Sequence, residues 1–221
     1  YGVLNYKNKS DKLIIFVHGL TGHKNEHQFY NAARFFPTHG FNTFRFDLYS
    51  WEKNARNLSD CAIKTHAEDV DRVVQYFLDK YRKIYLVGHS LGGPSILWSS
   101  QKYIKAVVLW DPSLMLIEKR GERTKHYPTI DKYTKQFGFE FFISPEMLKE
   151  WRTLDDAIFD HFKTPTKIIC AGNGVLYKEW QKKLKLIKPR HDFVIIKNTS
   201  HCFDEEEAEE KLFNETLKWI E

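Results

Sequence analysis

The chain has 221 residues, of which 42% are apolar and 29% charged; this favours one folded, soluble domain over a disordered, collagen-like or coiled-coil chain. Its longest apolar runs, residues 13–17 and 106–110, fall far short of the roughly 18 residues that cross a bilayer, so we expect no membrane span. The net charge of +5 comes from basic residues scattered among acidic ones, and without a zinc-finger spacing or an RNA-binding aromatic motif it does not indicate a nucleic-acid partner.

Strand-like and helix-like segments alternate through the first half of the chain. Hydrophobic periodicity and the positions of proline and glycine predict strands at residues 12–17, 43–48, 83–87 and 105–110 and helices at residues 25–36, 65–81 and 91–102. The helix at 65–81 has acidic residues early and basic residues late, as the helix dipole prefers. The valine-rich run at 105–110 is typical of a buried strand in a parallel sheet.

The alternation stops at residues 112–142, where no clean period appears. Basic residues gather there together with six aromatic ones, which are Tyr127, Tyr133, Phe137, Phe139, Phe141 and Phe142. Ser144 and Pro145 then suit the cap and first position of a helix. We interpret residues 112–150 as an insertion within a single domain that covers residues 1–221.

The second half resumes the alternation, with strands expected at residues 166–171 and 193–197 and helices at residues 177–187 and 204–221. The acidic run 205–210 fits the first turns of a solvated helix. Strands separated by helices predict an α/β fold, with a parallel sheet covered on both faces. Ligands of such sheets bind beyond the carboxyl ends of the strands.

The strongest functional signal is the segment from Gly88 to Gly93, which reads GHSLGG between a predicted strand and a predicted helix. In a sharp strand-to-helix turn of this kind the serine adopts strained backbone angles, and the glycines two residues away on either side leave room for close packing. Ser90 would then point out of the sheet at the start of the helix. The alternative is a serine that only caps a helix.

Together with this turn, two further segments resemble the α/β-hydrolase family, and the resemblance extends over nearly the whole chain. His18-Gly19-Leu20 matches the family's loop after an early strand, Ser90 its nucleophile, and His201 the histidine after its last strand. The resemblance implies the α/β-hydrolase fold, with residues 112–150 as a small cap. It also implies that the amides of Leu20 and Leu91 hold an oxyanion.

A serine hydroxyl is too weakly acidic to attack alone, so a neutral imidazole must take its proton and return it to the leaving group. His201 suits this role, because it follows a predicted strand by four residues and precedes the last helix. The alternative is a histidine that caps the helix or is simply exposed in a loop. His18 is expected to be structural, and His89 is expected to point away from its neighbour Ser90.

The acid of the triad departs from the family pattern. Val175 stands where the family usually carries an aspartate, and no acid occurs between Lys167 and Lys178. Our prediction is Asp111, which ends the preceding strand in a position that some lipases of the family use, although an aspartate before proline can also just cap a turn. Asn173 is the alternative, since its amide oxygen can hold an imidazole without a charge.

Two other patterns are weaker. Residues 23–27 read HKNEH, which matches a zinc-protease signature, but the hydrolase reading already explains a helix start there and no third ligand is marked. The three cysteines, Cys61, Cys170 and Cys202, are odd in number and far apart, which favours reduced thiols in a cytosolic enzyme. Cys202 is expected to be buried and not catalytic. Since the chain begins at Tyr1 and not at a methionine, the sequence leaves open whether a signal peptide has been removed.

The sequence therefore predicts a serine hydrolase that cleaves an ester or thioester through an acyl-enzyme, with no metal and no cofactor. The six aromatic residues favour a small substrate with an apolar acyl or aryl group, and the basic residues either hold a substrate carboxylate or are simply solvated. Amidase, lipase and carbon–carbon bond hydrolase activities share these motifs. A non-catalytic ligand-binding protein of the same fold is the alternative from another class. The sequence does not specify the oligomeric state.

Overall fold

The structure is a computed structural model that describes residues 1–6, 9–114, 124–136, 139–154 and 158–221. Its centre is a seven-stranded sheet in the order β1-β3-β2-β4-β5-β9-β10. Every neighbouring pair in it is parallel except β1 with β3. The expectation of a mostly parallel central sheet is thus confirmed. The strands are β1 (Gly2–Asn5), β2 (Lys12–Val17), β3 (Asn42–Phe46), β4 (Lys83–His89), β5 (Ile104–Trp110), β9 (Thr166–Ala171) and β10 (His191–Ile196).

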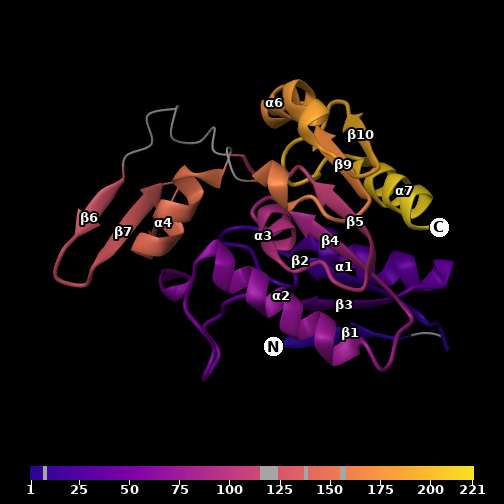
Figure 1. Ribbon diagram of the computed structural model, residues 1–221, viewed down its shortest axis with the longest axis horizontal. Helices are drawn as coiled ribbons and strands as arrows, with labels where there is room; N and C mark the ends of the chain where they lie inside the picture. Colours follow the sequence, from indigo (N-terminus) through magenta and orange to yellow (C-terminus); the bar gives the residue numbers. More distant parts are fainter. Residues whose placement is uncertain (7–8, 115–123, 137–138, 155–157) are drawn as a thin grey trace.

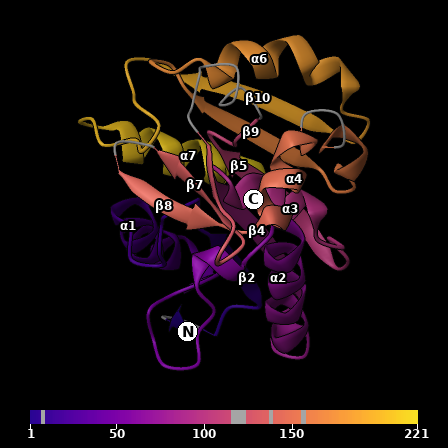
Figure 2. The ribbon, with the colours of Figure 1, turned by 90° about the vertical axis from the view of Figure 1, so that its left-hand side faces the viewer.

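Helices cover both faces of the sheet, as predicted (Figures 1 and 2). Figure 2 shows α1 and α7 on one side of the strands and α2 and α3 on the other. The α-helices are α1 (His27–Phe35), α2 (Ile63–Phe77), α3 (Gly92–Trp98), α4 (Pro145–Arg152), α6 (Leu176–Lys183) and α7 (Ala208–Ile220). Short 3-10 turns are η1 (Phe36–His39), η2 (Leu58–Asp60), η4 (Ile158–His161) and η5 (Leu184–Leu186). None of the described helices is both long and apolar enough to span a bilayer.

The strand β2 shows how the sequence builds two cores. Successive side chains of a strand point to opposite faces. Leu13, Ile15 and Val17 accordingly belong to the core that includes residues of α2, α3 and α6, whereas Ile14 and Phe16 belong to the core that includes residues of α1 and α7. All five side chains are buried, so a continuous apolar run is what this position in the sheet requires.

Several boundaries differ from the sequence prediction for local reasons. The last helix begins at Ala208 and not at residue 204, because Glu207 adopts a left-handed backbone with φ of 62°. The helix after Ser90 ends at Trp98, and Gln101 and Tyr103 beyond it also have positive φ. The edge strand β1 was missed, since its residues are only exposed or half-buried and carry no apolar run.

Part of the predicted insertion forms a second, three-stranded antiparallel sheet, in the order β6 (Lys125–Tyr127), β7 (Lys132–Gln136) and β8 (Glu140–Ile143). Figure 1 shows β6 and β7 reaching out to one side of the main sheet. We call these three strands the small sheet. The sequence predicted no strand here, since most of these side chains are not buried. Ser144 caps the following helix α4 as predicted, accepting a hydrogen bond from Met147 N at 2.9 Å.

Candidate active site

Ser90 occupies the turn between β4 and α3, as the motif predicts. Its φ is 53°, the left-handed conformation that non-glycine residues rarely adopt. The neighbouring strand holds this turn, because Ser90 N donates to the carbonyl oxygen of Trp110 at 3.0 Å. The backbone of such a strained turn at the end of a strand therefore sets the direction in which the Ser90 side chain points.

Close backbone approach explains the glycines around Ser90. A Cβ atom added to Gly92 would lie 2.2 Å from the carbonyl oxygen of Val17, and one added to Gly19 would lie 2.8 Å from Ser90 Cβ. Any side chain at either position would push the serine turn away from the loop after β2. The glycines thus bring the Gly19-Leu20 loop against the nucleophile candidate.

His201 and Asp111 lie 90 positions apart in the chain, and the fold brings their side chains together. Asp111 follows β5 with φ of 39°, and its buried carboxylate receives two hydrogen bonds. His201 Nδ1 donates to Oδ2 at 2.5 Å, and Ala171 N donates to Oδ1 at 3.1 Å. The imidazole is 43% exposed whereas the carboxylate is 2% exposed, so the ring is anchored on its inner side and open on its outer side.

The loop that carries His201 is held by two residues that the sequence analysis did not select for this purpose. His89 Nε2 lies 2.8 Å from the carbonyl oxygen of His201, and burial lowers the pKa of His89 to about 3, so the neutral ring donates this bond. The carboxylate of Glu205 accepts from Ser200 N at 2.7 Å and from the Thr199 hydroxyl at 2.8 Å. These bonds lower the pKa of Glu205 to about 2.

The two amides assigned to an oxyanion hole lie in the segments that meet at Ser90. Leu91 follows Ser90 directly and Leu20 follows Gly19. Among the described residues, the N–H groups of Leu20 and Leu91 donate to no protein acceptor. Backbone donors left without a partner beside a nucleophile are what an oxyanion hole requires.

His18 supports this loop from below. Its Nε2 accepts from Leu48 N at 3.0 Å, so its Nδ1 carries the proton and donates to the carbonyl oxygen of Gly19 at 2.8 Å. Burial lowers the pKa of His18 to about 4, which keeps the ring neutral. Tyr49 also donates to the Gly19 oxygen, at 2.9 Å. These contacts fit the expected structural role of His18.

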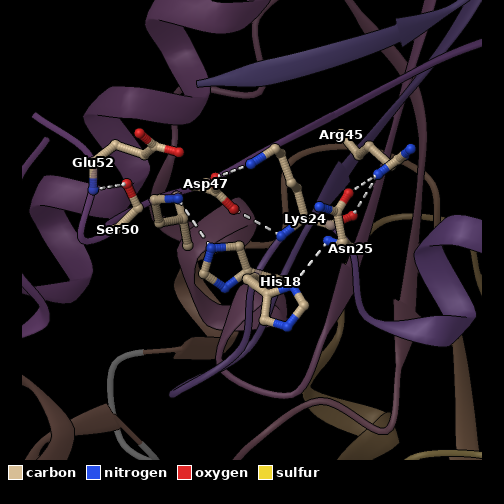
Figure 3. Close-up of polar contacts among 9 residues, drawn as sticks. His18, Lys24, Asn25, Arg45, Asp47, Ser50 and Glu52 are labelled. Atoms are coloured by element: carbon tan, nitrogen blue, oxygen red, sulfur yellow. Dashed lines mark hydrogen bonds and ion pairs between the residues drawn. The ribbon is translucent and has the colours of Figure 1, made fainter.

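The segment after this loop is tied to β3 by a polar network, shown in Figure 3. Lys24 donates to the Asp47 carboxylate twice, from its backbone N at 2.8 Å and from Nζ at 2.5 Å. Arg45 donates to the side-chain oxygen of Asn25 and, at 3.2 Å, to the carbonyl oxygen of Lys24. The network fixes the path of residues 23–26 between the Gly19 loop and α1.

The HKNEH segment does not present its two histidines on one helical face. His23 precedes α1 in an exposed turn, while His27 begins the helix and contacts Asp204 at 2.7 Å and Glu209 at 2.6 Å. Glu26 turns its carboxyl under Gly22, where burial raises its pKa to about 7. Among the described residues no cluster with the make-up of a metal site occurs.

The nucleophile candidate has a partner that the sequence did not suggest. Ser90 Oγ lies 3.1 Å from Ser113 Oγ, and among the described residues no hydrogen bond joins Ser90 to His201. The side chain of Asn173, the alternative to Asp111, is exposed, as is that of Val175 at the family's usual acid position, and among the described residues neither makes a hydrogen bond with His201. The structure therefore brings Asp111 to the histidine and leaves Asn173 apart from it.

A cleft of about 1140 Å³ opens next to the Gly19-Leu20 loop, and neither Ser90 nor His201 is among the residues that line it. It begins at Thr21 and Gly22, directly after Leu20, and runs between the loop 47–59 and the small sheet. Three of the six aromatic residues singled out in the insertion, Phe139, Phe141 and Phe142, line it together with Tyr49 and Trp51. Phe137 lies outside the described residues.

The cysteines are free thiols, and Cys61 and Cys170 are buried. Cys202 is only half-buried, which corrects the expectation that it is buried.

Comparison with known proteins identifies the family. The model of the alpha/beta hydrolase fold family matches residues 12–164, which is more than half of the chain. The chain belongs to the alpha/beta hydrolase fold family. No curated protein sequence is significantly similar to this alpha/beta hydrolase.

Solved structures share the fold over almost their full length. Est1E from Butyrivibrio proteoclasticus, solved with ferulic acid bound, is 22% identical with a TM-score of 0.81, covering 100% of this chain and 95% of Est1E. A dienelactone hydrolase from Anabaena variabilis is 17% identical with a TM-score of 0.72, covering 99% and 89%. A monoacylglycerol lipase from Paleococcus ferrophilus is 15% identical with a TM-score of 0.75, covering 100% and 97%.

Proposed function

We propose that this alpha/beta hydrolase is a serine hydrolase that cleaves a carboxylic ester or thioester through an acyl-enzyme. The observation that carries the proposal is the 2.5 Å hydrogen bond between His201 Nδ1 and the buried carboxylate of Asp111, at the end of the strand next to the one that presents Ser90. With Nδ1 protonated and bound to Asp111, the lone pair of the neutral ring is on Nε2. This is the atom that must accept a proton from serine.

The reaction then follows from the roles of these groups. Ser90 Oγ stays beside Ser113 while its proton turns towards Nε2 of His201; Ser90 gives up this proton and attacks the acyl carbon. Catalytic hydrogen bonds of this kind often tighten only when substrate is bound. The amides of Leu20 and Leu91 stabilise the oxyanion, and Asp111 stabilises the imidazolium. His201 returns the proton to the leaving alcohol or thiol, and water repeats the sequence to release the acid.

The aromatic cleft supports an apolar acyl or aryl group as the part of the substrate that this enzyme recognises. Its aromatic lining is suited to a flat or apolar group, and the ferulic acid in Est1E gives independent support for an aromatic acid. Thioesters, amides and other bonds share the same catalytic groups, so we base the choice of ester on this family resemblance and test it directly.

A fluorophosphonate probe tests the proposal, because it reacts with an activated serine and not with an ordinary hydroxyl. We expect labelling of the wild type, loss of labelling in Ser90→Ala, and unchanged labelling in Ser99→Ala, which removes another buried hydroxyl, whose one hydrogen bond within the described residues goes to the carbonyl oxygen of Ile96. A folded wild type that stays unlabelled contradicts the proposal. That result favours the non-catalytic ligand-binding alternative, which rests on Val175 standing at the usual acid position.

p-Nitrophenyl esters of increasing acyl length, with one aryl ester, then define the substrate. We expect the aryl ester and medium chains to be cleaved with a higher kcat/KM than acetate, because they fill more of the cleft. Removing two of the exposed cleft aromatics in Phe139→Ala/Phe142→Ala should reduce that preference without changing the rate for acetate. An unchanged preference separates the cleft from the acyl site.

A further inference from the structure

Ser113 is joined to the nucleophile candidate by two hydrogen bonds. Its backbone N donates to the carbonyl oxygen of Ser90 at 3.1 Å, and the two hydroxyl oxygens lie 3.1 Å apart. Ser113 is 5% exposed and follows Asp111 by two residues. The segment between them is fixed, because Trp180 Nε1 donates to the carbonyl oxygen of Pro112 at 2.9 Å. Ser113 is therefore held against Ser90 by the backbone as well as by its side chain.

The two hydroxyls depend on each other. Among the described residues, neither Ser90 Oγ nor Ser113 Oγ has another hydrogen-bond partner. Ser113 is buried, and a buried hydroxyl without a partner is unfavourable, so this pair is expected to persist wherever the chemistry permits it. In the free enzyme either oxygen can be the donor. After Ser90 has lost its proton, its oxygen can only accept, and the donor must be Ser113.

We propose that Ser113 is a further catalytic residue, whose hydroxyl donates a hydrogen bond to Ser90 Oγ while that oxygen carries negative charge. The inference rests on the proposed function, in which Ser90 is the nucleophile. It adds a donor to the attacking and leaving oxygen, in contrast to the amides of Leu20 and Leu91, which serve the oxygen of the substrate carbonyl.

The charge on Ser90 Oγ changes at two points of the cycle. During attack, its proton moves to His201 Nε2 while Oγ bonds to the acyl carbon and the carbonyl electron pair moves onto the carbonyl oxygen. During release, water has given its proton to Nε2 and its oxygen to the acyl carbon. The bond from that carbon to Oγ then breaks, the electron pair returns to Oγ, and Oγ takes the proton from Nε2. Ser113 keeps its own proton throughout.

A hydrogen bond to a charged oxygen is stronger than one to a neutral hydroxyl or an ester oxygen. The bond from Ser113 is therefore strongest when Oγ is partly anionic, that is, near the transition states. An interaction that gains strength in the transition state raises kcat. Since both partners belong to the enzyme, it contributes little to substrate binding and KM.

The test is the steady-state cleavage of a p-nitrophenyl ester by Ser113→Ala and Ser113→Thr. We expect Ser113→Ala to lower kcat by roughly 10- to 100-fold with KM within about twofold of wild type, the range expected for a hydrogen bond to a charged group. Ser113→Thr keeps the hydroxyl and should retain most of the activity. Ser99→Ala, the same loss of a buried hydroxyl outside the site, should leave kcat and KM unchanged.

Thermal melting of each variant shows that it is folded. If Ser113→Ala loses its cooperative transition, Ser113→Val replaces it, because valine and threonine have the same shape and differ in the hydroxyl. A kcat equal to that of the wild type in Ser113→Ala, or in Ser113→Val, overturns the inference. Faster labelling of that variant by the fluorophosphonate probe also overturns it, because Ser113 would then restrain Ser90 and not assist it. An equal loss of kcat in Ser113→Thr, which keeps the hydroxyl, and in the variant that lacks it overturns the inference as well. In each case labelling of Ser90 in the wild type leaves the proposed function standing.

Discussion

The carboxyl ends of β5 and β9 lie side by side and contribute to the site in different ways. β5 provides a side chain, because Asp111 follows its last residue and turns a buried carboxylate towards His201. β9 provides backbone, because Ala171 N donates to that same carboxylate and Asn173 N donates to the carbonyl oxygen of Thr199 in the histidine loop. The side chains that follow β9, Asn173 and Val175, face solvent.

This difference shows that β5 can provide the carboxylate that contacts His201 while β9 holds the histidine loop through its backbone. The backbone of β9 binds the histidine loop, and its N–H group satisfies the carboxylate that comes from β5. Two parallel neighbouring strands end at the same edge of the sheet, so a carboxylate from either can approach the same imidazole. The two positions, one after β5 and one after β9, differ in burial: Asp111 is buried, whereas Val175 is 41% exposed.

The largest effect is expected from removing the charge at the end of β5. Under the proposed function, Asp111→Asn should lower kcat on a p-nitrophenyl ester by roughly 10⁴-fold, as the same change does in Ser-His-Asp triads, because an amide at this place can hold the imidazole in the wrong tautomer and cannot stabilise the imidazolium. KM should change little. The rate is measured at saturating substrate, with circular dichroism to confirm folding.

The matched change at the end of β9 is Asn173→Ala, which should alter kcat by no more than about twofold, since the side chain is exposed and, among the described residues, makes no hydrogen bond to His201. A large loss from Asn173→Ala with little loss from Asp111→Asn would reverse the assignment of the acid. It would also mean that the histidine loop takes another conformation during catalysis.

A second experiment moves the acid back to β9. Val175→Asp in the Asp111→Asn background should recover roughly 10-fold or more of the lost kcat, because position 175 is where the family resemblance places the carboxylate and it directly precedes α6, whose N-terminus favours an anion. Val175→Asp alone should match the wild type. If kcat does not recover, a carboxylate at the end of β9 does not reach His201. The acid can then come from the end of β5 and not from the end of β9.

Sequence reasoning located the features that are local in the chain. The strand and helix alternation predicted the parallel sheet, and β9 has the predicted bounds of residues 166–171. The serine turn was recognisable because its glycines and its position between strand and helix lie within six residues. The small sheet was not predicted, because its strands of 3, 5 and 4 residues are too short for an alternating pattern to be recognised in the sequence.

Contacts between distant residues carried no comparable signal. Asp111 was one of two candidates, and what separates them is the backbone between β5 and β9, where Asp111 N donates to the carbonyl oxygen of Ile169. His89 was expected to point away from Ser90, and nothing in the sequence indicated that it holds the backbone of His201, a residue 112 positions later. Ser113 reaches Ser90 only because both strand ends are fixed by the sheet. Such pairings depend on strand order, which the sequence pattern does not encode directly.

The smallest effect concerns the histidine loop that both strand ends serve. Glu205 holds this loop through Ser200 N and the Thr199 hydroxyl, and Thr199 in turn receives the N–H of Asn173 from the end of β9. Glu205→Gln should lower kcat by about threefold, because an amide is a weaker acceptor than a carboxylate and the position of His201 becomes less fixed. Glu206→Gln removes the same charge from an exposed neighbour and should have no effect.

The same variant has a pH signature. The hydrogen bonds lower the pKa of Glu205 to about 2 from its ordinary value of 4.5, so in the wild type its contribution to folding is complete above about pH 4.5 and is lost as pH falls towards 2. The melting temperature of Glu205→Gln should therefore lie below that of the wild type at pH 7, and the difference should narrow steadily between pH 4.5 and pH 2. A difference that stays constant over this range would mean that the carboxylate of Glu205 is not what holds the loop, and that the link from β9 to the histidine depends on backbone contacts alone.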